Sequence, residues 1–324
     1  MKLGVGLYHY MLTEREFAFA RQCGCTDLIV HLANYYSNDK DIVKATDETS
    51  NYGSSVAMDS VWKYENIKAL CMKAEKQGLR IYGIENFSPA DWYDVLLDGP
   101  KKEEQMENLK EIIRNVGKAG IPCFGYNFSL AGVWGHQKTT EARGGAVSTC
   151  FDADLLKLDA KIPCGEVWNM TYAENATGEF IEEIGYEELW ERLRWFLEQI
   201  LPVAEEAGVV MALHPDDPPM PFLRNTPRLV YQPELYQKVL DLVPSPSNAI
   251  DFCMGSIQEM THGNIYDALE QYASQGKIAY THVRNVRGKV PKYTEVFVDD
   301  GDINIAKALE ILKKNDFKGV MIPD

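Results

Sequence analysis

Residues 209–219, VVMALHPDDPP, decide how the rest of the chain is interpreted. The apolar run at 209–213 predicts a buried strand, and His214 stands at its C-terminal end. Neither a strand nor a helix continues through the prolines that follow, because proline fixes φ and has no N–H group to donate. The sequence therefore predicts that His214 is held at a strand end, above a stiff and irregular loop.

Three later apolar runs end in the same way. They cover residues 248–253, 278–283 and 318–322, and each carries an ionisable residue at or just beyond its C-terminal end. The side chains at the four strand ends are those of His214, Cys253, His282 and Asp324. Two histidines, a cysteine and an aspartate together form a good ligand set for one divalent metal ion.

The apolar periodicity of the whole chain gives eight predicted strands in strict alternation with seven predicted helices. The strands are predicted at 3–8, 27–33, 80–87, 121–128, 209–213, 248–253, 278–283 and 318–322. The helices are predicted from Thr13 to Gly24, at 61–77, 103–118, from Tyr186 to Gly208, and at 233–243, 264–275 and 304–315, with a capping box at Thr13 and N-caps at Asn264 and Asp302. Alternating β and α units predict a parallel sheet, and eight units that close on themselves form the (β/α)8 TIM barrel of the α/β class.

We expect one TIM-barrel domain over residues 1–324, with insertions at about 34–59 and 129–182. The insertions follow the second and fourth strands, so both are expected over the C-terminal mouth of the barrel, where they can act as lids. The final helix of such a barrel is absent, because the sequence stops at Asp324. We therefore expect a longer native chain, and we expect Met321 to lie partly open to water.

The composition restricts the classes of partner. The chain has 324 residues, 45% hydrophobic content and a formal net charge of −15. This charge argues against nucleic acid or an anionic membrane as a partner, because both need a basic surface. The seven cysteines follow no disulfide spacing and no signal peptide begins the chain, so we expect reduced thiols in a cytoplasmic protein. The sequence does not decide the oligomeric state, and a homo-oligomer is one of the alternatives.

The four strand-end residues are expected to share one metal ion. In a TIM barrel the active site lies at the C-terminal ends of the strands, where these side chains converge. A single histidine or cysteine at such a place is more often structural, but four equivalent positions together favour a metal site. Imidazole, thiolate and carboxylate ligands suit manganese, iron, cobalt or zinc better than calcium or magnesium.

Two residues share strand faces with the expected ligands. Asp251 lies on the same face as Cys253, and it either orients a ligand or forms a salt bridge in the barrel interior. Arg284 lies on the same face as His282. Because a guanidinium group can bind a carboxylate through two hydrogen bonds, we expect Arg284 to bind a substrate carboxylate.

Two further strand ends and one loop supply other candidates. Glu85 ends the third strand and Asn127 the fourth, where each either hydrogen-bonds sugar hydroxyls or only anchors a loop. The loop at 134–145 contains His136 among an aromatic residue and cations. We expect this loop to close over a substrate, with a solvated surface loop as the alternative.

The chain resembles the mannonate dehydratase family of xylose-isomerase-like TIM barrels. The matching segments are Tyr126-Asn127-Phe128 with Trp134, His214-Pro215-Asp216-Asp217-Pro218-Pro219, Phe252-Cys253-Met254-Gly255-Ser256, His282-Val283-Arg284-Asn285-Val286, Asp300-Gly301-Asp302-Ile303-Asn304 and Met321-Ile322-Pro323-Asp324. The resemblance implies dehydration of D-mannonate to 2-dehydro-3-deoxy-D-gluconate in hexuronate breakdown, with Mn²⁺ or Fe²⁺ as the metal. The ligands of the family fall on His214, Cys253, His282 and Asp324. Family members continue past the Pro-Asp pair with a histidine and a last helix, which this sequence lacks.

The implied reaction needs two proton transfers. One proton leaves the carbon next to the carboxylate, and another must reach the departing hydroxyl, while a metal ion would stabilise the developing negative charge. The candidates for these transfers are Asp216, Asp217, His136 and Tyr8, and the sequence does not choose among them.

Two alternatives to dehydration are left open. A metal-dependent sugar isomerase or epimerase on the same barrel is one of them. Cys253 argues against it, because the related isomerases use mainly carboxylates with one histidine. A non-catalytic binder of sugar acids is the other, and it has no need of metal ligands.

Overall fold

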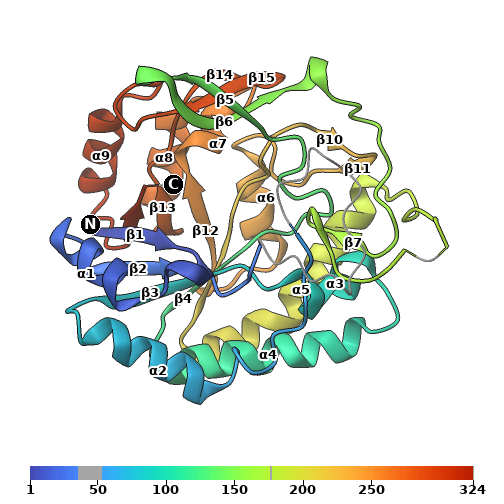
Figure 1. Cartoon of the computed structure of the whole chain (residues 1–324), viewed down its shortest axis with the longest axis horizontal. Coiled ribbons are helices and arrows are strands. Elements are labelled where there is room, and N and C mark those ends of the chain that lie inside the picture. Colours follow the sequence, from blue (N-terminus) through green and yellow to red (C-terminus); the bar gives the residue numbers. More distant parts are fainter. Residues whose placement is uncertain (36–52, 176, 324) are drawn as a thin grey trace.

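The computed structural model describes residues 1–35, 53–175 and 177–323, and it contains a closed barrel of eight parallel strands (Figure 1). In pairing order the strands are β1 (Lys2–Leu7), β16 (Val320–Ile322), β13 (Ile278–His282), β12 (Asn248–Cys253), β9 (Val210–Leu213), β4 (Cys123–Tyr126), β3 (Arg80–Glu85) and β2 (Asp27–Val30). The sheet closes where β1 pairs with both β16 and β2. The predicted TIM-barrel fold is therefore confirmed.

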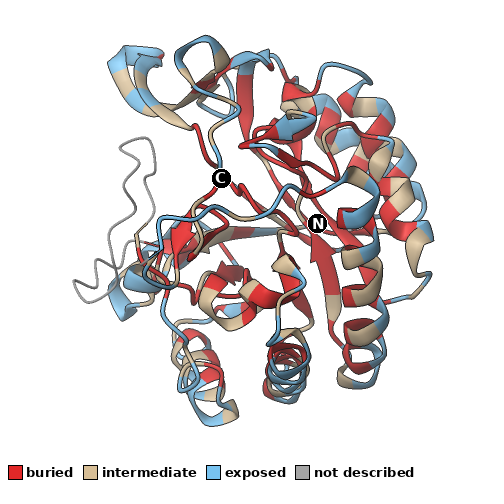
Figure 2. Cartoon of the chain, turned by 90° about the vertical axis from the view of Figure 1, so that its right-hand side faces the viewer, coloured by how far each residue is buried: buried red, intermediate tan, exposed pale blue. Residues whose placement is uncertain are grey.

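Most residues of the barrel strands are buried (Figure 2). In a barrel of this kind helices cover the outer side of the strands and side chains fill the interior. Every residue of β2, β4 and β12 is buried. This double burial explains why these strands show no alternation of polar and apolar residues in the sequence.

The helices agree with the predicted ones in order, and two more are present. Their bounds are α1 (Glu14–Gln22), α2 (Tyr64–Glu75), α3 (Pro89–Leu97), α4 (Lys102–Ala119), α5 (Tyr186–Ala207), α6 (Leu235–Leu242), α7 (Met254–Glu259), α8 (Ile265–Ser274) and α9 (Ile305–Lys314). Short 3-10 helices lie at His9–Met11, Arg143–Gly145 and Ala153–Leu155. The helices α3 and α7 were not predicted, and α7 begins directly after the end of β12.

Two of the three predicted helix caps are formed. Thr13 accepts a hydrogen bond at the start of α1, and Asn264 accepts two at the start of α8. The prediction of Asp302 as an N-cap was wrong, because α9 begins later and Asn304 caps it. The carboxylate of Asp302 instead accepts a hydrogen bond from the backbone N–H of Gly288, at 2.9 Å.

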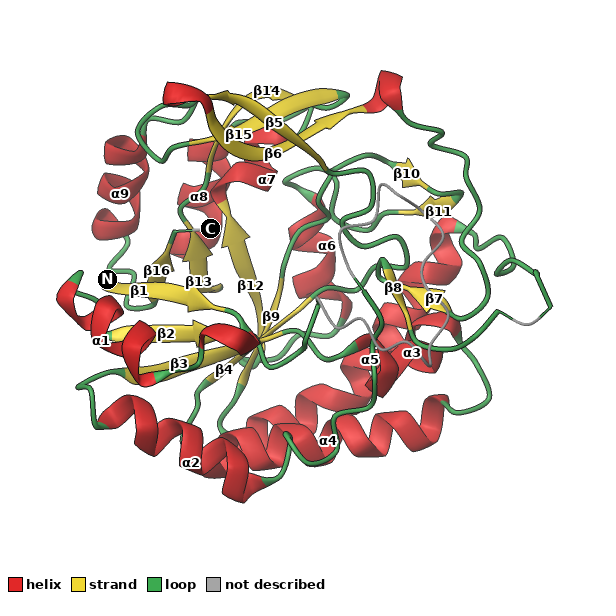
Figure 3. Ribbon diagram, in the orientation of Figure 1, coloured by secondary structure: helices red, strands yellow, loops and turns green. Residues whose placement is uncertain are grey.

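Two loops of the barrel meet in a four-stranded antiparallel sheet, here called the lid sheet (Figure 3). Its strands in pairing order are β14 (Asn285–Lys289), β15 (Lys292–Val296), β6 (Ala146–Asp152) and β5 (Gln137–Ala142). The strands β5 and β6 belong to the predicted insertion at 129–182, whereas β14 and β15 follow β13 and were not predicted. Because β6 pairs with β15, the lid sheet joins the loop after β4 to the loop after β13.

Smaller elements complete the connections between the barrel strands. The short strands are β7 (Glu166–Val167) with β8 (Met170–Thr171) and β10 (Phe222–Leu223) with β11 (Thr226–Pro227). Most of the predicted insertion at 34–59 falls on residues 36–52, which lie outside the described residues.

On the outer side of the barrel, the neighbouring strands β1 and β16 carry side chains that reach water. Leu3 is 46% exposed, and Met321, its partner in the register, is partly buried. The expectation that Met321 lies partly open to water is confirmed. Among the described residues, no helix combines the length and the apolar character that a membrane span requires.

Candidate active site

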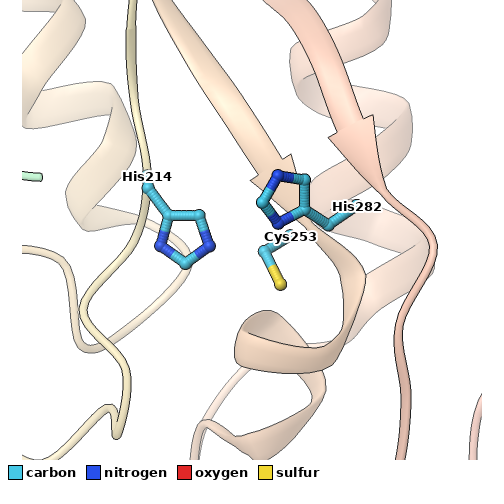
Figure 4. Close-up of side chains that lie close together, drawn as sticks. All are labelled: His214, Cys253 and His282. Atoms are coloured by element: carbon cyan, nitrogen blue, oxygen red, sulfur yellow. The ribbon is translucent and has the colours of Figure 1, made fainter. Parts of the chain in front are cut away.

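Three side chains converge from neighbouring strand ends of the barrel (Figure 4). His214 directly follows β9, Cys253 ends β12 and His282 ends β13. Cys253 and His282 are partners in the register of β12 and β13, which places their side chains next to one another. The three residues offer ligand atoms that all lie within 4.8 Å of one another. The fourth expected ligand, Asp324, lies outside the described residues.

The charges of this cluster suit a metal ion. Burial alone would raise the pKa of the Cys253 thiol, but the Arg284 cation and a hydrogen bond from His214 outweigh burial and lower this pKa to about 5. Burial disfavours the charged form of His214, yet its hydrogen bond with Cys253 raises the pKa of His214 to about 9. The two side chains therefore form a thiolate–imidazolium pair at neutral pH. A divalent cation bound by both would replace the proton that they share.

The orientation of His214 also fits a metal ligand. Its Nδ1 lies 2.7 Å from the backbone carbonyl oxygen of Pro215, which only accepts hydrogen bonds. Nδ1 therefore carries a proton, and Nε2 is the nitrogen that can bind a metal. A histidine ligand in a protein typically donates its other N–H group to a carbonyl or carboxylate in this way.

Two buried carboxylates lie behind His282. Its Nε2 is 3.3 Å from Oε2 of Glu85 and 3.4 Å from Oδ2 of Asp251. Burial raises the pKa of Asp251 to about 7. Burial would also raise the pKa of Glu85, but the positive charges of His31 and His282 outweigh burial and lower this pKa to about 2. His282 thus lies within ion-pair distance of both carboxylates.

A small residue makes room for this arrangement. The hydroxyl group of Tyr280 donates a hydrogen bond to Oε2 of Glu85 at 3.1 Å. A Cβ atom at Gly125 of β4 would lie only 2.1 Å from this hydroxyl oxygen. Gly125 is therefore required for the position of Tyr280 and, through it, of Glu85.

A cavity of about 210 Å³ opens beside the cluster. The predicted site residues that line it are Tyr8, Glu85, Asn127, His136, His214, Asp217, His282 and Arg284. Lining residues that were not predicted include His31, Tyr35, Asn86, Trp168 and Glu295. His31 had a usable signal, because it directly follows β2 just as His214 follows β9. The others lie in loops or in the lid sheet, where no local pattern marks them.

One wall of the cavity is aromatic and amide-rich. The ring of Tyr8 stacks on that of His31, with their centroids 4.8 Å apart. The side-chain amide of Asn127 donates to Oδ1 of Asn86 at 3.1 Å, and the amide of Asn86 donates to the hydroxyl oxygen of Tyr35 at 3.1 Å. These rings and amides provide an apolar surface and hydrogen-bonding groups of the kind that hold a sugar.

The two adjacent acids after β9 have different environments. Oδ2 of Asp216 accepts hydrogen bonds from the backbone N–H groups of Leu229 and Val230, each at 2.8 Å. Its Oδ1 is paired with Nε of Arg228 at 2.9 Å, and Asp216 does not line the cavity. Asp217 lines the cavity instead. The geometry therefore favours Asp217 over Asp216 for a role in proton transfer.

The guanidinium group of Arg284 is surrounded by carboxylates. It is paired with Asp217, and it donates to Oε1 of Glu259 and to Oε1 of Glu295, each at 3.0 Å. A Cβ atom at Gly255 would lie 2.3 Å from Nε of Arg284, so α7 can pack here only with glycine at this position. Arg284 lines the cavity, but these partners already use much of its capacity to bind carboxylates.

The lid sheet contributes a second polar cluster to the site. Nε2 of His136 lies 3.2 Å from Oδ1 of Asp217 and 2.9 Å from the hydroxyl oxygen of Tyr293. The hydroxyl group of Tyr293 donates to the same Oδ1 of Asp217 at 2.7 Å. His136 precedes β5 in the loop after β4, and Tyr293 lies in β15 in the loop after β13. Residues from these two loops, here called the lid segments, therefore bind one carboxylate of the barrel.

Comparisons with known proteins identify the family of the chain. The family model described as D-mannonate dehydratase (UxuA) matches residues 52–324. The mannonate dehydratase of Geobacillus thermodenitrificans (strain NG80-2) is 30% identical over 291 residues, which cover 83% of this chain and 76% of that protein. The mannonate dehydratase of Streptococcus equi subsp. zooepidemicus (strain MGCS10565) is 32% identical over 282 residues, with the same two coverages of 83% and 76%.

Solved structures extend the comparison. The crystal structure of mannonate dehydratase from Streptococcus suis serotype2 has a TM-score of 0.77 and 27% sequence identity, and the match covers 100% of this chain and 83% of that chain. The D-psicose 3-epimerase from Clostridium cellulolyticum H10 has a TM-score of 0.59 and 12% identity, with coverage of 100% and 84%. At this lower identity the epimerase shares the barrel fold alone.

Proposed function

This chain belongs to the D-mannonate dehydratase family, and we propose that it removes water from D-mannonate to give 2-dehydro-3-deoxy-D-gluconate. The observation that carries the proposal is the convergence of His214, Cys253 and His282 beside a polar cavity, in a chain that the family model matches over most of its length. The family match supports dehydration and supports neither isomerisation or epimerisation of a sugar nor binding without catalysis.

We propose that Mn²⁺ or Fe²⁺ is held by His214, Cys253 and His282, with Asp324 as the fourth ligand. Nitrogen and thiolate donors together suit a borderline transition metal, and the low pKa of Cys253, about 5, supplies the thiolate at neutral pH. The cation would supply the positive charge that stabilises the anion formed when a proton leaves the carbon next to the substrate carboxylate.

The residues of the chain bind the substrate and move its protons in this proposal. Tyr8 and His136 are the proposed proton-transfer groups, one for the carbon-bound proton and one for the departing hydroxyl, because both line the cavity. Asp217 is the partner of His136. The sequence also suggested Asp216 as a proton-transfer group, but Asp216 is paired with Arg228 and does not line the cavity.

Three further residues are proposed to contact the sugar acid. Asn127 and Glu85 line the cavity with groups that hydrogen-bond hydroxyls. Arg284, which also lines the cavity, is proposed to contact the substrate carboxylate. We further propose a place in hexuronate breakdown and a cytoplasmic location, which the seven free cysteines support.

Product analysis tests the proposed function. Purified protein loaded with Mn²⁺ or Fe²⁺ is incubated with D-mannonate, and the formation of a 2-keto acid is measured. Elemental analysis of the same sample gives its metal content, and a ketose serves as the control substrate. We expect a 2-keto acid from D-mannonate, no reaction of the ketose, and loss of activity with a chelator. A metal-loaded protein that forms no 2-keto acid would refute dehydration.

A further inference from the structure

We propose that Tyr293 is a positioning residue that holds the ring of His136 in one tautomer and one orientation, so that Nδ1 is the nitrogen that exchanges a proton with the substrate. This inference rests on the proposed function, because it gives the proton-transfer role of His136 its geometry. It also links the lid sheet to catalysis, since Tyr293 and His136 come from different lid segments. The two residues are 157 positions apart in the sequence.

The hydrogen bonds around Tyr293 determine where its single proton lies. Burial and the neighbouring charge of Asp217 raise the pKa of Tyr293 well above its usual value, so Tyr293 is a neutral phenol. Its shortest hydrogen bond, at 2.7 Å, goes to Oδ1 of Asp217, which as a carboxylate only accepts. The phenol proton is therefore used in this bond, and the oxygen of Tyr293 can only accept from any other partner.

His136 must then be the donor in its own contacts. Its Nε2 lies 2.9 Å from the oxygen of Tyr293 and 3.2 Å from Oδ1 of Asp217, and both of these atoms accept. Nε2 consequently carries a proton in the neutral ring as well as in the charged ring. Only Nδ1 gains and loses a proton, and a general acid or base is most effective when this atom is fixed.

The position of Tyr293 depends on the pairing of the two lid segments. Tyr293 is opposite Phe151 in the register of β15 and β6, and their rings stack with centroids 5.8 Å apart. Beside this pair, Nζ of Lys292 lies 2.7 Å from Oδ2 of Asp152. Tyr293 itself is 1% exposed. Its hydroxyl group therefore reaches Asp217 and His136 only when β6 and β15 are paired.

The first test compares Tyr293→Phe with a control on the same strand. Thr294→Val removes the neighbouring hydroxyl group, which bonds Glu141 of the lid sheet at 3.2 Å and does not touch Asp217 or His136. We expect Tyr293→Phe to lower kcat about tenfold, as for the loss of one hydrogen bond, with KM changed less than about twofold. Thr294→Val should retain kcat. Equal effects of the two variants, or a rise in KM alone, would overturn the positioning role.

The second test is a double-mutant cycle with His136→Gln. If Tyr293 acts through His136, then Tyr293→Phe causes no further loss of kcat once His136 has been replaced. A purely structural contribution would multiply with the loss caused by His136→Gln. Multiplying losses would therefore overturn the proposal even if both single variants are slow.

A third readout does not depend on activity. Protein loaded with zinc, which is diamagnetic, and labelled with ¹⁵N-histidine gives ring-nitrogen spectra, with His136 assigned from the His136→Gln variant. We expect a protonated Nε2 and an unprotonated Nδ1 for His136 in the wild type, and a mixture of tautomers in Tyr293→Phe. A wild-type ring protonated at Nδ1 alone would overturn the inference. If the wild type makes no 2-keto acid, the proposed function fails, whereas these spectra still decide the inference.

Discussion

The cluster of His214, Cys253 and His282 and the cluster of His136, Asp217 and Tyr293 border the same cavity, but they are built differently. The first stands on strand ends of the barrel, where parallel ladders fix the backbone on both sides. The second takes Asp217 from the loop after β9, His136 from just before β5 and Tyr293 from β15. Metal ligands need a rigid frame, whereas groups that meet a substrate can come from segments that assemble over it.

The two clusters also differ in what holds their charges. In the strand-end cluster, a thiolate and an imidazolium face one another and a cation would replace their proton. In the lid cluster, the Asp217 carboxylate is held by the cation of Arg284 and by hydrogen bonds from Tyr293 and His136. The first is therefore expected to control metal content, and the second to control turnover. The following predictions separate these two functions.

The largest effect is expected from Cys253→Ser. Serine does not supply a thiolate at neutral pH, so metal affinity should fall by more than the roughly 10- to 100-fold that loss of an outer partner costs, and activity should fall with it. Elemental analysis and the 2-keto acid assay measure both. Cys71→Ser, which changes a buried free cysteine of α2, is the matched control. Full metal content and activity in Cys253→Ser would remove Cys253 from the metal site.

Substitutions of the adjacent acids Asp216 and Asp217 should affect different properties, the free energy of unfolding for Asp216 and the turnover rate for Asp217. Asp217→Asn removes the charged partner of His136, so it is expected to lower kcat on the order of 100-fold, as when the contribution of one proton-transfer group is lost, and to retain the metal. Asp216→Asn should retain kcat but lower the free energy of unfolding by about 3–5 kcal/mol, because it leaves Arg228 buried without its charged partner. Kinetics and denaturant unfolding of both variants test this difference. A catalytic defect in Asp216→Asn at normal stability would reverse the assignment.

Arg284→Lys tests a residue that interacts with both clusters, with Cys253 of the first and Asp217 of the second. Lysine retains the charge but loses the planar fork that contacts Asp217, Glu259 and Glu295. We expect kcat/KM for D-mannonate to fall about tenfold, consistent with the loss of one charge-assisted hydrogen bond, and metal content to be retained. Unchanged kinetics would remove Arg284 from the substrate site, and loss of metal would assign it to the first cluster.

The last prediction concerns a graded effect, the dependence of metal binding on pH. At pH 7 Cys253, with a pKa of about 5, is a thiolate, and His214, with a pKa of about 9, is protonated. A cation that binds both must displace one proton, so its affinity should rise about tenfold per pH unit between about pH 5 and pH 9. Calorimetry in buffers of different ionisation enthalpy measures the proton released. Binding at pH 7 without proton release would contradict the thiolate–imidazolium pair.

Local patterns were sufficient to predict the barrel. Apolar runs such as those of β9 and β12 have to be buried on both faces, and the caps at Thr13 and Asn264 mark helix starts that depend only on neighbouring residues. The positions of His214, Cys253 and His282 followed from the same strand ends, because parallel strands of a closed barrel all point to one mouth.

The lid cluster could not be predicted in this way. The pairing of β6 with β15 joins segments far apart in the chain. Neither segment has a sequence pattern that identifies the strand with which it pairs. Asp216 and Asp217 are identical side chains at adjacent positions, and only the packing of Arg228 on one side and Arg284 on the other distinguishes them.

The sequence by itself thus determined the eight barrel strands, seven of the described helices and the barrel mouth, because periodicity, proline and capping residues act over a few neighbours. The tertiary structure alone decided which acid faces the cavity, how the guanidinium group of Arg284 is surrounded, and where Tyr293 meets His136. These features depend on contacts between distant segments, whose free energy arises from burial and hydrogen bonding that no single segment provides.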